Sequence, residues 1–303
     1  MTLEPAINPL EPARRELAHL LDCAAPHDGI HPLLPFTWVF RASSPTSPSH
    51  MVYSPVLCVM AQGRKQVMVG EDRFVYDTEH FLLTSITVPA AGQVLDATPL
   101  RPYLSMAIAL EPAMVASVIG EAGLPQPKPA LPRHAMESCR MTAPLLDAVV
   151  RLARNFESPG DEFLALLALR EITYRLLAGP QAGRLHQIAA HTGEAERLSR
   201  ALSWLREHFD QPLSIPALAR HCGMSASALH QGFKDATAMT PLQYQKQLRL
   251  QEARRLMSSE GLDAARAGFR VGYGDPSYFS RDYKRFFGEP PRQHAAREHS
   301  EVW

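Results

Sequence analysis

A spacing of small residues occurs twice toward the end of this 303-residue chain, and the two copies lie 49 residues apart. In the first copy Ala219 precedes Gly223 by four residues, and in the second Gly268 precedes Gly272 by four. Two helices that cross closely need a small side chain on the first helix and a residue that tolerates positive φ in the turn. The repeat therefore predicts two helix-turn-helix units within one chain.

Apolar residues at matching positions around each turn are expected to lock the paired helices together. In the first copy they are Leu218, Cys222, Met224, Leu229 and Phe233, and in the second Val271, Tyr273, Tyr278 and Phe279. Cys222 is thereby interpreted as a core residue rather than a reactive thiol. Ser214 is expected to cap the first helix of the first unit.

A long helix is predicted between the copies, from about Leu242 to Ser258, and Gly261 is expected to end it. About 17 helical residues span about 25 Å. Successive major-groove faces on one side of B-DNA lie about 34 Å apart. One chain of this kind is thus expected to place two recognition helices in adjacent major grooves, with some bending of the DNA.

Charge is distributed unevenly along the chain. The whole chain has no net charge, yet residues 196–297 hold sixteen Lys and Arg against ten Asp and Glu. This charge distribution is expected when a basic module contacts phosphate groups and the acidic remainder of the chain does not. Apolar residues make up 46% of the chain and charged residues 20%, as in soluble globular proteins.

The region from Phe36 to about Leu110 reads as strands. Short β-branched and aromatic runs alternate with Pro, Gly and Asp signals. Residues 67–69 and 73–76 have strand-like sequences and flank the turn signal Gly70-Glu71-Asp72, which predicts a hairpin. The six expected short strands favour a barrel or a sandwich.

Three other segments surround this region. Residues 1–35, with a short helix over residues 12–23, are interpreted as a lead-in arm, and the proline-rich residues 124–134 as a linker. Two helices are expected within residues 143–178. Their apolar faces must be buried against the barrel, against each other or against a second subunit, so a homodimer is one of the alternatives.

Two stretches resemble the DNA-binding signature of the AraC/XylS family of regulators: LSIPALARHCGMSASALHQGFKDATAMTPLQYQKQLRLQEARRLM and GFRVGYGDPSYFSRDYKRFFGEPP. The chain departs from the family at Ala238, where glycine is usual, and at Ala267-Gly268, where Ile-Ala or Val-Ala is usual. The segment from about Thr37 to Ile119 resembles the N-terminal domain of one AraC subgroup, which is a cupin-like effector barrel.

The resemblance implies an α+β protein with a cupin-like β-barrel and helical hairpin followed by an all-α, double helix-turn-helix domain. The expected boundaries are an arm at 1–35, an effector and dimerisation domain at 36–190 and a DNA-binding domain at 195–297. The expected partners of the protein are double-stranded operator DNA, a small-molecule effector, a second copy of the chain and, in an activator, RNA polymerase.

Polar residues on the two recognition helices are the predicted base contacts. The family positions imply this role for Ser227, His230 and Gln231, and the corresponding residues of the second unit are Ser277, Ser280 and Arg281. Arg281 stands out because arginine can make a bidentate contact with guanine. The expected phosphate contacts are Lys234, Arg249, Lys284 and Arg285. The alternative for all of them is an ordinary solvated helix face.

In the strand region, four residues are candidates for lining an effector pocket: Trp38, Arg41, Cys58 and Tyr103. Ordinary packing is the alternative for each. A metal-dependent enzyme of this fold would need clustered His and carboxylate ligands, and the histidines of the strand region are only His80, beside Glu79, and His50 in a Ser/Pro-rich loop. No catalytic residue, metal or cofactor is therefore expected.

Three classes of function fit these patterns: an effector-responsive transcription factor, an enzyme with a DNA-targeting tail, and a ligand-independent architectural DNA binder. The first is favoured, because the sequence has no catalytic constellation and a long N-terminal part of its own. Without an apolar run of about 18 residues or a leader pattern, a cytoplasmic location with no membrane contact is expected. The four scattered cysteines fit reduced thiols.

Overall fold

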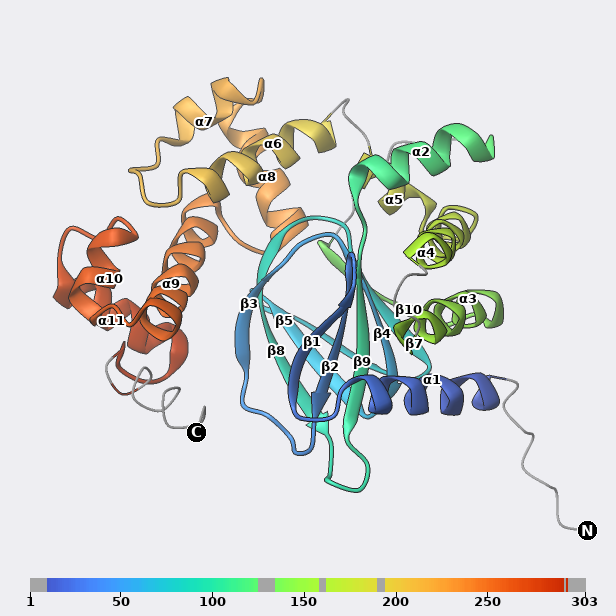
Figure 1. Ribbon diagram of the computed structural model, residues 1–303. Helices are drawn as coiled ribbons and strands as arrows, with labels where there is room; N and C mark the ends of the chain where they lie inside the picture. Colours follow the sequence, from blue (N-terminus) through green and yellow to red (C-terminus); the bar gives the residue numbers. More distant parts are fainter. Residues whose placement is uncertain (1–9, 125–133, 158–161, 190–193, 292, 294–303) are drawn as a thin grey trace, which may run out of the picture. The chain divides into compact units, whose positions relative to one another are not determined.

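The computed structural model describes residues 10–124, 134–157, 162–189, 194–291 and residue 293. The chain divides into two compact units: residues 1–49 and 53–192 form the first, and residues 50–52 and 193–303 the second. We name them the β unit and the helical unit (Figure 1).

The β unit is built on ten strands among the described residues. They are β1 (Gly29–Leu34), β2 (Thr37–Ala42), β3 (Ser49–Tyr53), β4 (Val56–Gln62), β5 (Arg64–Val69), β6 (Asp72–Asp77), β7 (His80–Thr84), β8 (Val88–Asp96), β9 (Tyr103–Ala109) and β10 (Met136–Arg140). One sheet has the order β1-β2-β9-β4-β7-β10, and the other β3-β8-β5-β6. No ladder between described strands closes the two sheets into a barrel, so the strands form a two-sheet arrangement.

The predicted hairpin is present as β5 and β6. Val69 pairs with Asp72, and Gly70 supplies the positive φ of 58° that the tight turn requires. The predicted α+β class is confirmed by these sheets and the helices that follow.

The described residues of the β unit also form five α-helices: α1 (Glu11–Ala24), α2 (Pro112–Ala122), α3 (Ala143–Arg154), α4 (Glu162–Leu177) and α5 (Ala182–Ala189). Alternate residues of the larger sheet, such as Leu57 and Val59 of β4, are fully buried in one core with Leu17 and Leu21 of α1. Helices α1, α3 and α4 lie on the same side of the sheets (Figure 1). The outer face of the larger sheet is thus covered by helices.

Several strand and arm expectations differ from the structure. Residues 10–34, interpreted as an arm, form α1 and β1 within the β unit, because α1 buries an apolar stripe on the sheet. The run HFLLTSITV is two strands, β7 and the start of β8, because the two belong to different sheets. Strands β3 and β10 were not expected. Most of the predicted linker, residues 125–133, lies outside the described residues.

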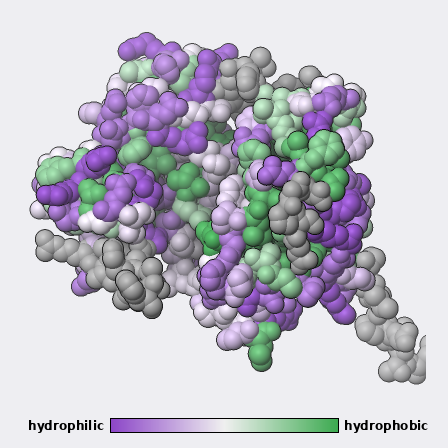
Figure 2. Space-filling model, viewed as in Figure 1, coloured by the Kyte–Doolittle hydropathy of each residue, from purple (hydrophilic) through white to green (hydrophobic). Residues whose placement is uncertain are grey.

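The outward side of α4 is apolar. Phe163 is 70% exposed, and Leu164, Leu166, Leu167 and Tyr174 are exposed as well. Figure 2 shows hydrophobic residues at the surface over this helix. The sequence left three alternatives for burying this face: the barrel, the other helix of the pair, or a second subunit. In the structure neither the sheet nor α3 covers these side chains.

The helical unit consists of six helices in the described part of the chain: α6 (Glu194–Glu207), α7 (Ile215–His221), α8 (Ala226–Thr237), α9 (Pro241–Glu260), α10 (Ala264–Arg270) and α11 (Pro276–Phe287). Helix α9 packs against α8 and α6 near one end and against α10 and α11 near the other. It therefore joins two small helical bundles.

Candidate DNA-binding site

Each bundle contains a helix-turn-helix whose helices begin at polar caps. Ser214 and Ser225 accept hydrogen bonds from the amides of Ala217 and Ala228 at the starts of α7 and α8. In the second bundle Asp263 and Asp275 cap α10 and α11. Each cap accepts a hydrogen bond from an amide that has no partner within the helix, and this helps to fix where each helix begins. The predicted cap at Ser214 is confirmed.

The two turns have the predicted glycine conformation. Gly223 has φ +66° and Gly272 has φ +88°, both in the left-handed region that favours glycine. A Cβ on Gly272 would also lie 1.9 Å from the carbonyl oxygen of Asp210, whereas one on Gly223 would meet nothing within 4 Å. The second turn is therefore the more tightly constrained of the two.

The small residue at the helix crossing is explained in the second unit by one aromatic ring. A Cβ on Gly268 would lie 2.9 Å from Cγ of Phe279, which is fully buried against the first helix of the pair. Glycine in place of the family's usual alanine thus lets the Phe279 ring pack against backbone. The departure at Gly268 fits the packing of the unit.

Most of the predicted apolar contacts are buried, including Cys222, Leu229, Phe233, Val271, Tyr273 and Phe279. Burial raises the pKa of the Cys222 thiol, as expected for a core residue. Tyr278 is the exception, because its side chain is 53% exposed and lies on the outer face of α11. The prediction that Tyr278 packs in the core is wrong.

The outer face of α8 presents the residues predicted to meet the first DNA groove. Ser227, His230, Gln231 and Lys234 are all exposed. Gln231 donates to Asp235 one turn later, at 2.7 Å, so its amide is held along the helix in the free protein. These side chains share one solvent-facing surface and are free to contact a partner.

The outer face of α11 carries a comparable set. Ser277, Arg281, Lys284 and Arg285 are exposed, and Ser280 is half-buried. The Arg281 guanidinium lies 5.4 Å from the centre of the Tyr278 ring, which is a cation–π distance. Tyr278 is thus an exposed aromatic that supports the predicted base-reading arginine, and sequence reasoning missed it.

Arg249 of α9 is placed differently from the other predicted phosphate contacts. Its Nε donates to the carbonyl of Phe209 at 2.5 Å, and its two terminal nitrogens donate to Gln211 and Gly272, at 2.8 Å and 3.0 Å. Burial lowers the pKa of this guanidinium. The side chain joins the end of α6 to the turn of the second unit, and the geometry favours this structural role.

Helix α9 sets the spacing of the two units. It has 20 residues and begins with a capping box of Thr240 and Gln243, and Gly261 ends it with φ +66°. At about 1.5 Å per residue such a helix is about 30 Å long. That length is close to the roughly 34 Å between successive major-groove faces.

The effector candidates of the β unit are divided between two faces of the larger sheet. The register aligns Trp38 and Cys58 with the same residue of β9, Ala107, and Tyr103 lies on the same period-two face. This face looks toward the smaller sheet, because Tyr103 lies beside Lys65 of β5.

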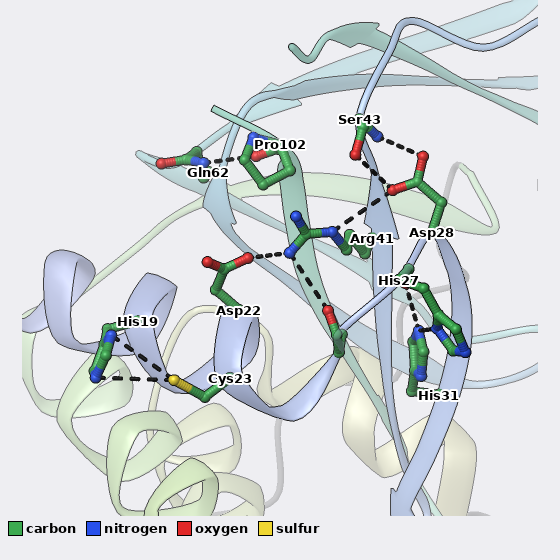
Figure 3. Close-up of polar contacts among 11 residues, drawn as sticks. His19, Asp22, Cys23, His27, Asp28, His31, Arg41, Ser43, Gln62 and Pro102 are labelled. Atoms are coloured by element: carbon green, nitrogen blue, oxygen red, sulfur yellow. Dashed lines mark hydrogen bonds and ion pairs between the residues drawn. The ribbon is translucent and has the colours of Figure 1, made fainter. Parts of the chain in front are cut away.

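Arg41 belongs to the opposite face, toward α1. It forms ion pairs with Asp22 and Asp28 and also donates to the carbonyl of Ala25 (Figure 3). The structure therefore places three of the four predicted effector residues on one face of the larger sheet and leaves Arg41 among structural contacts on the other.

Lys65 is a residue of the inter-sheet face that sequence reasoning missed. It is directly opposite Tyr76 on β6 and Val94 on β8, and both of these residues are buried. The available signal was its period-two relation to Val67 and Val69, which places a cation on the apolar side of the strand.

Across the described ranges, no three His, Cys, Asp or Glu side chains gather closely enough to hold a metal ion. None of the described helices combines the length and hydrophobicity required to span a bilayer.

The fold and site define a two-unit protein in which a two-sheet β unit precedes a double helix-turn-helix unit. Residues 34–184 match the family model of the AraC-type transcriptional regulator N-terminus, and residues 218–297 match a helix-turn-helix domain model. The chain belongs to the AraC family of transcriptional regulators.

Similar proteins agree with this assignment. The HTH-type transcriptional activator RhaS of Citrobacter koseri is 32% identical over 155 residues, which cover 50% of this chain and 55% of RhaS. RhaS of Klebsiella pneumoniae is 31% identical over the same length. The match thus spans about half the length of these relatives.

Among solved structures, apo ToxT from Vibrio cholerae aligns with 86% of this chain and 97% of its own, with a TM-score of 0.58 and 8% identity. A second ToxT structure from Vibrio cholerae gives a TM-score of 0.57 at 10% identity. At this identity the likeness concerns the fold alone.

Proposed function

We propose that this protein is a sequence-specific DNA-binding regulator of transcription, in which the helical unit reads DNA and the β unit senses a small molecule. The observation that carries the proposal is the pair of capped, outward-facing helices α8 and α11, set at opposite ends of the 20-residue α9. This arrangement suits two adjacent major grooves on one side of the duplex.

On this proposal, base contacts come from Ser227, His230, Gln231, Ser277, Ser280 and Arg281. Their exposure or half-exposure on α8 and α11 supports the assignment. Lys234, Lys284 and Arg285 are the phosphate contacts, because they are exposed cations at the C-terminal side of the same helices. Arg249 acts chiefly by holding the second unit in position.

The β unit supplies the sensing function through the face shared by Trp38, Cys58 and Tyr103. A regulator rather than a catalyst is favoured because the family consists of regulators. Relatives named as activators support a role in which the bound protein contacts RNA polymerase.

A second copy of the chain is the proposed partner of the β unit. The exposed apolar side chains of α4 border a groove with Phe36, whose own φ of +64° is unusual for a bulky residue. An apolar helix face that meets its own copy across a two-fold axis is self-complementary. We therefore assign α4 to the homodimer contact.

The test is a genome-wide map of binding sites, joined to salt-dependent titrations of the full protein on the sites found. We expect an enriched motif with two blocks about 10 base pairs apart, one for each recognition helix. Binding should weaken steeply with salt, because phosphate contacts release counterions. Absence of any enriched motif, together with salt-insensitive binding, would rule the proposal out.

A further inference from the structure

The space between the two sheets of the β unit holds a cluster of polar side chains in otherwise apolar surroundings. Lys65 comes from β5 and Tyr53 from β3, and across from them lie Cys58 of β4 and Tyr103 of β9. The Lys65 Nζ is 5.1 Å from the centre of the Phe40 ring and 5.9 Å from that of Tyr103. We call these five residues the inter-sheet cluster.

Lys65 has no carboxylate partner. It makes no hydrogen bond or ion pair with any residue that the structure describes, although its neighbour Arg64 pairs with Asp96 at 2.9 Å on the outer side. Its surroundings are aromatic rings and the Cys58 thiol. Lys65 is half-buried, and a cation that is partly removed from water normally has a partner of opposite charge.

Tyr53 adds a second donor without an acceptor. It is 6% exposed, and its hydroxyl has no hydrogen-bond partner in the described part of the chain, whereas the fully buried Tyr103 hydroxyl lies beside those of Tyr76 and Ser105. Buried hydroxyls in folded proteins are nearly always hydrogen-bonded, so a buried hydroxyl without a partner requires an explanation. The Tyr53 hydroxyl and the Lys65 ammonium can both donate to the same acceptor.

Gly92 of β8 allows these groups to come together. A Cβ at this position would lie 2.8 Å from the Tyr53 hydroxyl and 3.0 Å from Cε of Lys65. Both side chains therefore approach the same point on the strand, where any larger residue would push them apart.

The thiol does not supply the missing negative charge. Burial raises the pKa of Cys58 to about 11, so the group stays protonated at neutral pH. Burial also lowers the pKa of Lys65. Lys65 and Tyr53 thus lack acceptors, and a bound anion would accept hydrogen bonds from both.

We propose that the inter-sheet cluster binds the carboxylate of a small organic acid, with Lys65 and Tyr53 as the groups that recognise the anion. The proposal rests on the proposed sensing function and names the chemical class of its effector. The Phe40 and Tyr103 rings provide an apolar wall for the body of the acid, and the remaining exposure of Lys65 leaves the cation in reach of solvent.

The test compares two acids with their neutral amides on the full protein. Isothermal titrations use benzoate against benzamide and hexanoate against hexanamide. We expect at least one acid to bind tenfold or more tightly than its amide. Equal affinity of acid and amide in both pairs overturns the proposal.

Variants then locate the site. Lys65→Met keeps an unbranched side chain, one atom shorter, and removes the half-buried charge, so the fold should tolerate it, and the preference for the acid should disappear. Tyr53→Phe is the second variant and should weaken acid binding several-fold. Arg64→Met is the matched control, because Arg64 faces outward, and its acid binding should equal that of the unmodified protein. Retention of the acid preference in Lys65→Met overturns the assignment.

Failure of this inference is separable from failure of the proposed function. The unmodified protein is titrated with DNA in parallel, without any acid. Salt-sensitive DNA binding together with equal affinity for acid and amide leaves the regulator in place and rejects the carboxylate site. A borohydride-trapped adduct of Lys65 with benzaldehyde, without acid preference, would instead assign a carbonyl ligand and also reject it.

Discussion

Residues on the outer face of α11 differ in what they can recognise. Arg281 is exposed and stacked on Tyr278, so its guanidinium fork is partly oriented before DNA arrives. We expect Arg281→Ala to weaken binding to the specific site by about 1–3 kcal/mol while random DNA is barely affected. Competition titrations with specific and random duplexes measure this difference.

Lys284→Ala is the control on the same helix. Lys284 is exposed and one turn from the helix end, which suits a phosphate contact. Its loss should weaken both duplexes about equally and reduce the salt slope by about one. If Arg281→Ala weakened both duplexes in proportion, Arg281 would be a backbone contact instead.

Ala238 is an alanine in a glycine conformation. It ends α8 with φ +54°, and its amide donates to the Lys234 carbonyl, whereas the equivalent end of α11 has Gly288 with φ +85°. A left-handed residue with a Cβ costs about 1 kcal/mol or more. Ala238→Gly should therefore raise the free energy of unfolding by about 1 kcal/mol, measured by urea denaturation.

The opposite substitution at the equivalent end of α11 tests whether backbone strain is the cause. No atom lies within 4 Å of a Cβ on Gly288, so Gly288→Ala tests backbone strain alone and should lower stability by a similar amount. A stabilising effect of Gly288→Ala would show that these helix ends rearrange freely.

Single residues were predictable from the sequence where the chemistry is local. Turn glycines and the Ser214 cap followed from neighbouring positions, and the structure confirms them. Lys65 and Arg249 were not predictable in this way, because their surroundings come from strands or helices distant in sequence. Tyr278 was misplaced because the turn of the second unit is one residue longer, so the buried position that corresponds to Leu229 is Phe279 and its neighbour Tyr278 faces outward.

At the scale of elements, the two helix-turn-helix turns differ in tolerance. Gly272→Ala would combine positive φ with a clash against the backbone of Asp210, whereas Gly223→Ala meets no atom within 4 Å. We expect Gly272→Ala to cost more than about 3 kcal/mol and Gly223→Ala about 1–2 kcal/mol. Equal losses in denaturation experiments would show that the Asp210 carbonyl moves aside without cost.

Elements were predicted well where periodicity and caps lie within one segment, as in α7 to α11. The strands were harder, because β3 and β10 are short and owe their place to partners elsewhere in the chain. The break between β7 and β8 arises because each strand pairs in a different sheet, β7 with β4 and β10 and β8 with β5. Such long-range pairing leaves little trace in local patterns.

At the scale of the whole molecule, an apolar α4 surface on a β unit that already has a core of its own calls for a partner. A second copy would bring four helix-turn-helix units to one DNA site, and binding of one half would raise the effective concentration of the other. Dimerisation would thereby increase affinity without any new DNA contact.

The double variant Leu164→Glu with Leu167→Glu tests the α4 interface. Both side chains are about half exposed, at 49% and 48%, so charges there should leave the fold intact yet be buried in a dimer at high cost. Sedimentation at micromolar concentration should give a dimer for the unmodified protein and a monomer for the variant. Leu242→Glu, at a 55% exposed leucine of α9, is the matched control and should remain dimeric. An unmodified protein that sediments as a monomer with and without DNA, or a double variant that stays dimeric, would exclude α4 as the interface.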